Sequence, residues 1–150
     1  MNLLYISISG NTRSFLKRLQ SFAEEQKRVN TNAVTFTLKE IDDNCLFESE
    51  LEPFIAFVPT YLEGGNGVDN GTQEILTETL REYIEFENNA SRCLGVVGSG
   101  NKNFNRQYCL TAKQYAQQFD VPMLEDFELR GTSADIERIY AILSELRDNS

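Results

Sequence analysis

Apolar runs of strand length alternate along this chain with segments whose apolar residues recur at helical spacing. Residues 3–6 form a continuous apolar run that ends in small polar residues, which is typical of a buried strand. Directly after it, apolar side chains recur every three or four positions over about 12–27, with charged residues between them, and this predicts an amphipathic helix. Because the alternation continues along the chain, it favours a parallel sheet with helices packed on its faces.

Five strands and four helices are predicted from this alternation. The strands lie at 3–6, 33–38, 54–58, 94–97 and 122–129, and the helices at about 12–27, 75–84, 104–119 and 132–146. Right-handed crossovers leave few ways to order such strands, and we predict an α/β three-layer sandwich with the flavodoxin-like strand order 2-1-3-4-5. No linker, repeat or low-complexity stretch divides the sequence, so we expect residues 1–150 to form one domain.

The composition excludes several classes of function. The chain has no histidine, which excludes Ser-His-Asp and Cys-His catalysis and His-ligated zinc sites. A formal net charge of −9 disfavours nucleic acid and anionic membrane as partners. Three cysteines match no metal motif, and there is neither a basic leader nor an apolar run of about 18 residues, so we expect a cytoplasmic protein.

Three polar loops follow the first, third and fourth predicted strands. They are residues 7–12, 59–71 and 98–103, and the second is glycine-rich over 64–71. In a parallel α/β sheet, ligands bind beyond the carboxyl ends of the strands, where the strand order reverses. We therefore predict that the three loops meet in one site and that 64–71 is a functional loop.

The first of these loops has the composition of a phosphate site. Residues 7–12 read Ser-Ile-Ser-Gly-Asn-Thr, and they supply hydroxyls, an amide and a glycine at the start of a helix, where free backbone N–H groups favour an anion. The alternative is that Ser9 or Thr12 merely caps the helix. The loop has neither the Gly-Lys-Ser/Thr ending of a nucleotide P-loop nor a dinucleotide G-x-G-x-x-G pattern, which favours a mononucleotide whose phosphate is not transferred.

Four segments together resemble known flavin proteins. Loop 7–12 is similar to the flavodoxin loop that binds the phosphate of FMN, and segments 59–61, 98–104 and 127–132 resemble the NrdI family of flavodoxin-like proteins. The resemblance runs in the same order over residues 3 to about 140. The chain differs in one respect, because Leu62 and Glu63 separate Tyr61 from the glycines that often follow it directly in that family.

The resemblance implies a set of cofactor-binding residues for FMN. The phosphate would be held by Ser7, Ser9, Gly10, Asn11 and Thr12. Thr60 and Tyr61 would line the flavin ring, with Tyr61 stacked on it, and the ring edge would meet Gly100, Asn101, Asn103 and Phe104. The alternative for Tyr61 and Phe104 is that they fill the core.

The resemblance also implies a function. NrdI proteins help to activate class Ib ribonucleotide reductase: an electron donor reduces the bound FMN, oxygen is converted to superoxide or peroxide, and this oxidant reaches the dimanganese small subunit, where a tyrosyl radical is assembled. Such a protein is a redox activator rather than a conventional substrate-turnover enzyme, and no protein residue need be catalytic. Two alternatives stay open, a general flavodoxin that carries single electrons and an FMN-binding paralogue that does not serve the reductase.

Other reactive side chains receive no role from the sequence. Cys93 and Cys109 are expected to be buried small apolar residues, and Cys45 to be partly exposed without a basic neighbour to activate it. Acidic residues recur along one face of the helix predicted at 75–84, and we expect that face to be solvated: Glu74, Glu78, Glu82 and Glu85.

Overall fold

Five parallel strands form one sheet in the predicted order β2-β1-β3-β4-β5. The computed structural model describes residues 1–62, 71 and 73–149. The strands are β1 (Asn2–Tyr5), β2 (Thr37–Glu40), β3 (Phe54–Pro59), β4 (Cys93–Gly100) and β5 (Met123–Glu128). Every residue of β3 is buried, as expected for the middle strand of a parallel sheet. The predicted α/β fold and strand order are confirmed.

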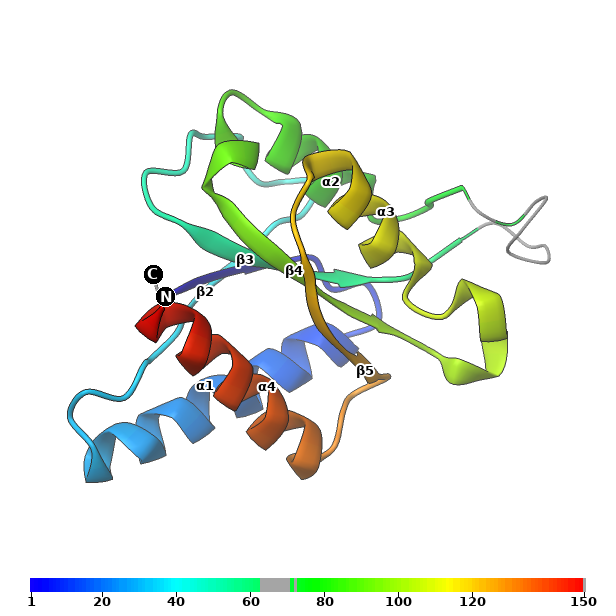
Figure 1. Cartoon of the computed structure of the whole chain (residues 1–150). Helices are drawn as coiled ribbons and strands as arrows, with labels where there is room; N and C mark the ends of the chain where they lie inside the picture. Colours follow the sequence, from blue (N-terminus) through cyan, green and yellow to red (C-terminus); the bar gives the residue numbers. More distant parts are fainter. Residues whose placement is uncertain (63–70, 72, 150) are drawn as a thin grey trace.

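Two pairs of helices cover the two faces of this sheet (Figure 1). Helices α1 (Asn11–Val29) and α4 (Ser133–Asp148) lie on one face, and α2 (Glu78–Glu85) and α3 (Leu110–Phe119) on the other. Successive side chains of a strand point to opposite faces, so Leu3 packs in the core beneath α1 and α4 while Leu4 packs in the core beneath α2 and α3. The result is a three-layer sandwich.

The second strand begins later than the sequence pattern predicts. The strand was expected over 33–38, whereas β2 starts at Thr37 and pairs with β1 from the Asn2–Thr37 register onward. Val34 and Phe36 are nevertheless buried in the core beneath α1 and α4. Their burial explains why the sequence alternates like a strand before Thr37. Pairing between β1 and β2 starts only at Thr37, because the four-residue β1 begins at its partner Asn2.

Two helix starts also differ from the prediction. Helix α2 begins at Glu78, because Ile75 and Leu76 are exposed and Leu76 has a left-handed backbone with φ of 68°. The prediction that Glu74 belongs to a solvated helical face is wrong, since its side chain is only 9% exposed and precedes the helix. The helix expected over 104–119 is divided into a 3-10 helix η2 (Lys102–Gln107) and α3, with Cys109 in a left-handed conformation between them.

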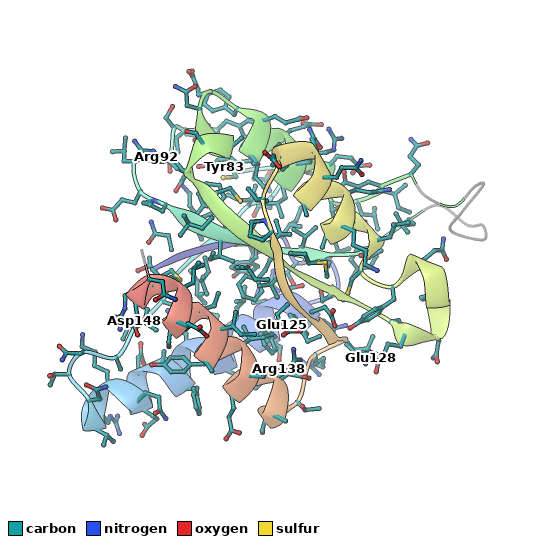
Figure 2. All side chains as sticks on the ribbon, in the orientation of Figure 1. Tyr83, Arg92, Glu125, Glu128, Arg138 and Asp148 are labelled. Atoms are coloured by element: carbon teal, nitrogen blue, oxygen red, sulfur yellow. The ribbon has the colours of Figure 1, made fainter. Side chains whose placement is uncertain are left out.

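The last helix is capped and tied to the edge strand. Thr132 and Asp135, which have the sequence spacing of a capping box, form one: the Thr132 hydroxyl accepts from the Asp135 N–H at 3.2 Å, and the Asp135 carboxylate accepts from the Thr132 N–H at 2.8 Å. Arg138 of α4 forms an ion pair with Glu125 of β5, and the two side chains lie next to each other in Figure 2. These contacts fix α4 against β5.

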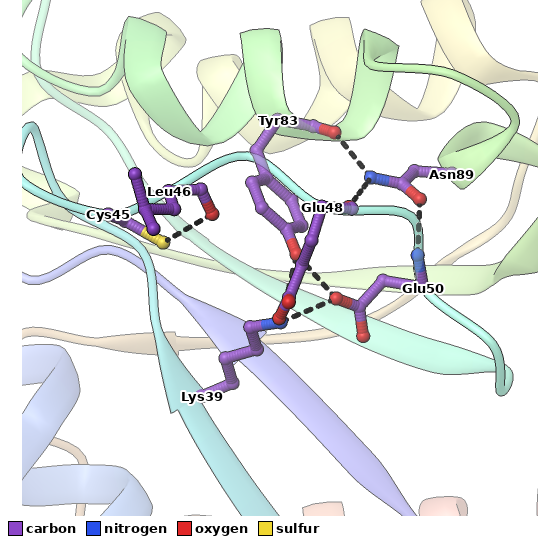
Figure 3. Close-up of polar contacts among 7 residues, drawn as sticks. All are labelled: Lys39, Cys45, Leu46, Glu48, Glu50, Tyr83 and Asn89. Atoms are coloured by element: carbon purple, nitrogen blue, oxygen red, sulfur yellow. Dashed lines mark hydrogen bonds and ion pairs between the residues drawn. The ribbon is translucent and has the colours of Figure 1, made fainter.

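Side-chain contacts fix the connection between β2 and β3. Residues 41–53 contain no helix. Lys39 of β2 forms ion pairs with Glu48 and Glu50 and also donates to the Tyr83 hydroxyl at 2.9 Å (Figure 3). The buried Asn89 side chain, which belongs to the short helix η1 (Asn89–Arg92), accepts from the Glu50 N–H at 2.7 Å and donates to the Tyr83 carbonyl at 2.9 Å. The segment is therefore attached to the layer that contains α2.

Across residues 1–62, 71 and 73–149, no helix is both long enough and apolar enough to cross a lipid bilayer.

Candidate functional site

A cavity of about 470 Å³ lies where the loops after β1, β3 and β4 meet. The neighbouring strands β1 and β3 are where the strand order reverses, which is the position at which ligands bind in this class of sheet. The predicted convergence of the loops is confirmed for the residues that the structure describes. The lining residues are Ser9, Asn11, Thr12, Pro59, Thr60, Tyr61, Leu62, Ser99, Gly100, Asn101, Phe104, Gln107 and Leu129.

The loop after β1 presents the start of α1 to this cavity. Gly10 is the N-cap of α1 and has a left-handed backbone with φ of 88°, a conformation that glycine adopts readily. A Cβ atom at this position would meet no atom of the described residues within 4 Å, so the space beside Gly10 is open among them. Gly10 has no side chain that could cap the helix, and among the described residues the side chain that accepts from a first-turn N–H is Ser7, so the alternative in which Ser9 or Thr12 serves as the cap is wrong.

The donors at this helix start suit a phosphate group. The first N–H groups of a helix have no partner within the helix. Among the described residues, the Arg13 N–H donates to Ser7 Oγ at 3.2 Å, and the N–H groups of Asn11 and Thr12 have no acceptor. Free N–H groups, two hydroxyls and the positive end of a 19-residue helix form a donor set that matches an anion.

Tyr61 connects two of the three loops. Its hydroxyl lies 2.8 Å from Ser9 Oγ, and its carbonyl accepts from the Ile75 N–H at 2.8 Å. The neighbouring Thr60 accepts from the Thr111 N–H at 3.3 Å through its hydroxyl, and its own N–H donates to the Ser99 carbonyl at 3.0 Å. Tyr61 therefore forms part of the cavity wall, and the alternative that it fills the core is wrong.

The loop after β4 forms another part of the wall. The Asn101 side chain accepts from the Asn103 N–H at 2.9 Å, and the Asn101 carbonyl accepts from the Phe104 N–H at 3.0 Å. Phe104 is 60% exposed at the cavity and does not fill the core. A Cβ atom at Gly100 would lie 3.0 Å from the Cys109 N, which leaves little room there for any larger residue.

The structure brings most of the predicted residues together. Eight of the predicted residues line the cavity: Ser9, Asn11, Thr12, Thr60, Tyr61, Gly100, Asn101 and Phe104. Ser7, Gly10 and Asn103 belong to the same loops without lining it. Ser7 supports the first turn of α1 through its contact with the Arg13 N–H, and Asn103 is exposed. The glycine-rich segment 64–71 lies outside the described residues except for Gly71.

Leu129 and Gln107 are lining residues that the sequence did not single out. Leu129 follows β5 with a left-handed backbone (φ of 54°), is 47% exposed, and donates its N–H to the Gly100 carbonyl at 2.9 Å. Gln107 donates to the Gly71 carbonyl at 2.6 Å and so joins the β4 loop to the β3 loop. The sequence places Leu129 only as the last residue of the strand predicted over 122–129, and no local pattern marks Gln107.

The cysteines behave as the sequence predicts. Cys93 and Cys109 are buried, Cys45 is half-buried, and none of the three forms a disulfide. Burial raises the pKa of the Cys93 thiol to about 11 and that of the Cys109 thiol to about 12, so both thiols stay protonated at neutral pH. Cys109 lies beside Gly100 but does not supply a thiolate nucleophile.

Comparison with known proteins decides the family. The family model described as NrdI flavodoxin-like matches residues 3–141. The chain belongs to this family. Among its relatives, a NrdI-like protein of Streptococcus pyogenes serotype M18 is 52% identical over 143 residues, which cover 95% of this chain and 91% of that protein. Protein NrdI of Mycoplasmopsis pulmonis is 31% identical over 139 residues, covering 93% and 80%.

Solved flavodoxin structures share the fold of this NrdI-family chain. A short-chain flavodoxin associated with a bacterial microcompartment superposes with a TM-score of 0.64 at 17% identity, covering 99% of this chain and 97% of that one. The flavodoxin of Fusobacterium nucleatum, solved bound to flavin mononucleotide, gives a TM-score of 0.61 at 13% identity, covering 99% and 96%. At these identities the likeness concerns the fold.

Proposed function

We propose that this NrdI-family chain binds FMN without a covalent bond in the cavity described above. The observation that carries the proposal is the start of α1, where Gly10 leaves open space beside free N–H groups and the hydroxyls of Ser9 and Thr12. These donors would hold the phosphate, with the helix dipole adding to their effect. Asn11 would close the same side, and Ser7 would keep the turn in place.

The remaining lining residues would hold the flavin ring. Thr60 and Tyr61 would contact its face, with Tyr61 oriented by its hydrogen bond to Ser9. Gly100, Asn101, Asn103 and Phe104 would surround its edge, and the short Asn101 turn would direct backbone groups toward the ring. When bound, FMN supplies the electron transfer and the reaction with oxygen, and the protein supplies orientation and electrostatics.

The biological role that we propose is activation of a ribonucleotide reductase. A flavin-reducing electron donor would recharge the protein, and superoxide or peroxide formed from oxygen would pass to the dimanganese small subunit of a class Ib enzyme for assembly of its tyrosyl radical. Family membership supports this role, as do the exposed Phe104 and Leu129 at the cavity, which suit a docking surface. Free cysteines support a reducing compartment, and we propose the cytoplasm.

Radical assembly tests this role. The reduced protein, oxygen and the Mn(II)-loaded small subunit should together generate a tyrosyl radical that electron paramagnetic resonance detects, and a general flavodoxin of similar potential should not. Asn103→Trp, at an exposed position of the β4 loop, should lower the radical yield while FMN stays bound. Glu24→Trp on the exposed side of α1 is the matched control and should leave the yield unchanged.

One outcome would overturn the role without touching FMN binding. If a competent cognate subunit forms no radical while superoxide or peroxide is measured in the same mixture, the activator role is wrong. The general electron carrier or the paralogue without a reductase would then account for the FMN site.

A further inference from the structure

The carboxylate of Glu74 is held inside the molecule by three donors. One carboxylate oxygen accepts from the Tyr115 hydroxyl at 2.6 Å and also from the Thr77 hydroxyl. The other accepts from Arg81 Nε at 2.8 Å. The donors come from α3, from the residue that caps α2 and from α2 itself. Glu74 therefore connects the segment after the glycine-rich loop to both helices on that face of the sheet.

The backbone at Glu74 continues directly into the cavity wall. Glu74 forms an isolated antiparallel bridge with Leu62, and the N–H of the next residue, Ile75, donates to the Tyr61 carbonyl at 2.8 Å. Tyr61 and Leu62 both line the cavity. A continuous chain of contacts therefore runs from α2 and α3 through Glu74 to Tyr61, whose hydroxyl ends 2.8 Å from Ser9.

The local geometry indicates that this contact has a purpose beyond stability. Replacing a buried carboxylate together with its donors by well-packed apolar side chains is often neutral or stabilising, so stability alone does not account for a charged group at this position. Leu76, two residues further on, is 53% exposed and keeps a left-handed backbone, which a non-glycine residue adopts only where its surroundings hold it. Burial and the neighbouring Glu74 raise the pKa of Tyr115, so its hydroxyl stays a donor at neutral pH.

We propose that Glu74 is a positioning residue for the flavin: it fixes the backbone of Tyr61 and Leu62, and so sets how the Tyr61 ring lies against the ligand. The inference rests on the proposed function, in that FMN is taken as the occupant of the cavity. Glu74 does not itself line that cavity, so it acts through Tyr61 rather than by contact.

Three variants test whether Glu74 is a positioning residue. Glu74→Gln removes the charge from the buried position, and Tyr115→Phe removes one donor while keeping the ring. Glu82→Gln makes the same charge change at an exposed position of α2 and is the matched control. The readouts are amide exchange of the Ile75 N–H in the FMN-free protein, FMN affinity by fluorescence titration, and the visible circular dichroism of the flavin at saturating FMN.

Glu74→Gln should speed Ile75 exchange and weaken FMN binding by about tenfold, because binding must then order the Tyr61 backbone that Glu74 no longer fixes. It should also change the dichroism of the bound flavin, because the Tyr61 ring moves relative to it. Tyr115→Phe should change all three readouts in the same direction by less, and Glu82→Gln should stay within about twofold of the wild type. If Glu74→Gln does not fold, Tyr115→Phe carries the test alone.

The result that overturns the inference is a lowered melting temperature in Glu74→Gln with unchanged FMN affinity and unchanged flavin dichroism. Glu74 would then be a structural residue only. Failure of the proposed function looks different, because the wild-type chain would itself not bind FMN. In that case, unchanged Ile75 exchange in Glu74→Gln would also show that Glu74 does not fix the Tyr61 backbone. Faster exchange would show that it does, independently of any flavin.

Discussion

At the scale of single residues, some residues of the site could be predicted from their position in the sequence, and others depend on a local backbone conformation. Ser9, Thr12 and Tyr61 could be predicted because each lies in the loop or at the helix start that follows a strand, and the sheet brings the ends of those strands together. Leu129 could not, since its place in the wall depends on a left-handed φ and a hydrogen bond to Gly100. Glu74 was misread because helical spacing extends backward past the true start of α2 at Glu78.

The Thr12 hydroxyl should contribute directly to phosphate binding. Thr12→Val keeps the shape of the buried side chain and removes the hydroxyl, and we expect FMN affinity to fall by at least about tenfold, from a loss of roughly 1.5–3 kcal/mol. Ser9→Ala should weaken binding similarly, with an added effect from the lost contact to Tyr61. Fluorescence titration measures both. Thr12→Ser, which retains the hydroxyl, should bind nearly as well as the wild type, and equal affinity in Thr12→Val would place the phosphate elsewhere.

Leu129 should show opposite effects on stability and binding. Glycine adopts the left-handed conformation at little cost, so Leu129→Gly should leave the melting temperature unchanged or raise it. The same change removes an apolar wall of the cavity and should weaken FMN binding several-fold. Glu87→Gly is the control, an exposed left-handed residue that does not line the cavity. A loss of stability in Leu129→Gly with full FMN affinity would contradict this interpretation.

At the scale of elements, periodicity predicts which segments are helices and strands, but not every boundary. The capping box of α4 could be predicted because Thr132 and Asp135 act locally. The attachment of residues 41–53 could not, because Lys39 meets Glu50 and Tyr83 only after the sheet and α2 have assembled. The start of β2 was predicted too early for a related reason. Val34 and Phe36 are buried and so resemble strand residues, although pairing with β1 begins only at Thr37.

The Lys39 cluster should give the protein a measurable alkaline transition. Burial, together with the hydrogen bond to Glu50, raises the pKa of Tyr83 from 10.0 to about 12. The folded state keeps this proton while the unfolded state loses it, so the free energy of unfolding should fall as pH rises from 10 to about 12. Tyr83→Phe should have a lower free energy of unfolding at pH 7 than the wild type. That free energy should also fall less steeply between pH 10 and about 12, as measured by urea titration. Tyr140→Phe, which removes a hydroxyl bound to a backbone carbonyl, is the control. An unchanged slope in Tyr83→Phe would assign the transition to another group.

At the scale of the whole molecule, the fold was predictable because independent signals agree. Strand runs, helical spacing and the crossover rule all favour the same sheet, and each core face is filled from both strands and helices. The sequence pattern says less about what the cavity binds, because its lining comes from three sequence-distant loops and from the residue after β5. Its most specific feature is that anion donors line it at the start of α1, while aromatic side chains, Tyr61 and Phe104, line it in the loops after β3 and β4.

The direct test of the account is to compare FMN with riboflavin on the wild-type protein by fluorescence titration. The two ligands share the flavin ring and differ in the phosphate, so the comparison isolates the role of the α1 start. With several charge-assisted hydrogen bonds at roughly 1.5–3 kcal/mol each, FMN should bind on the order of a hundredfold or more tightly than riboflavin. Equal affinities, or no binding of either ligand, would contradict the assignment of this cavity to FMN.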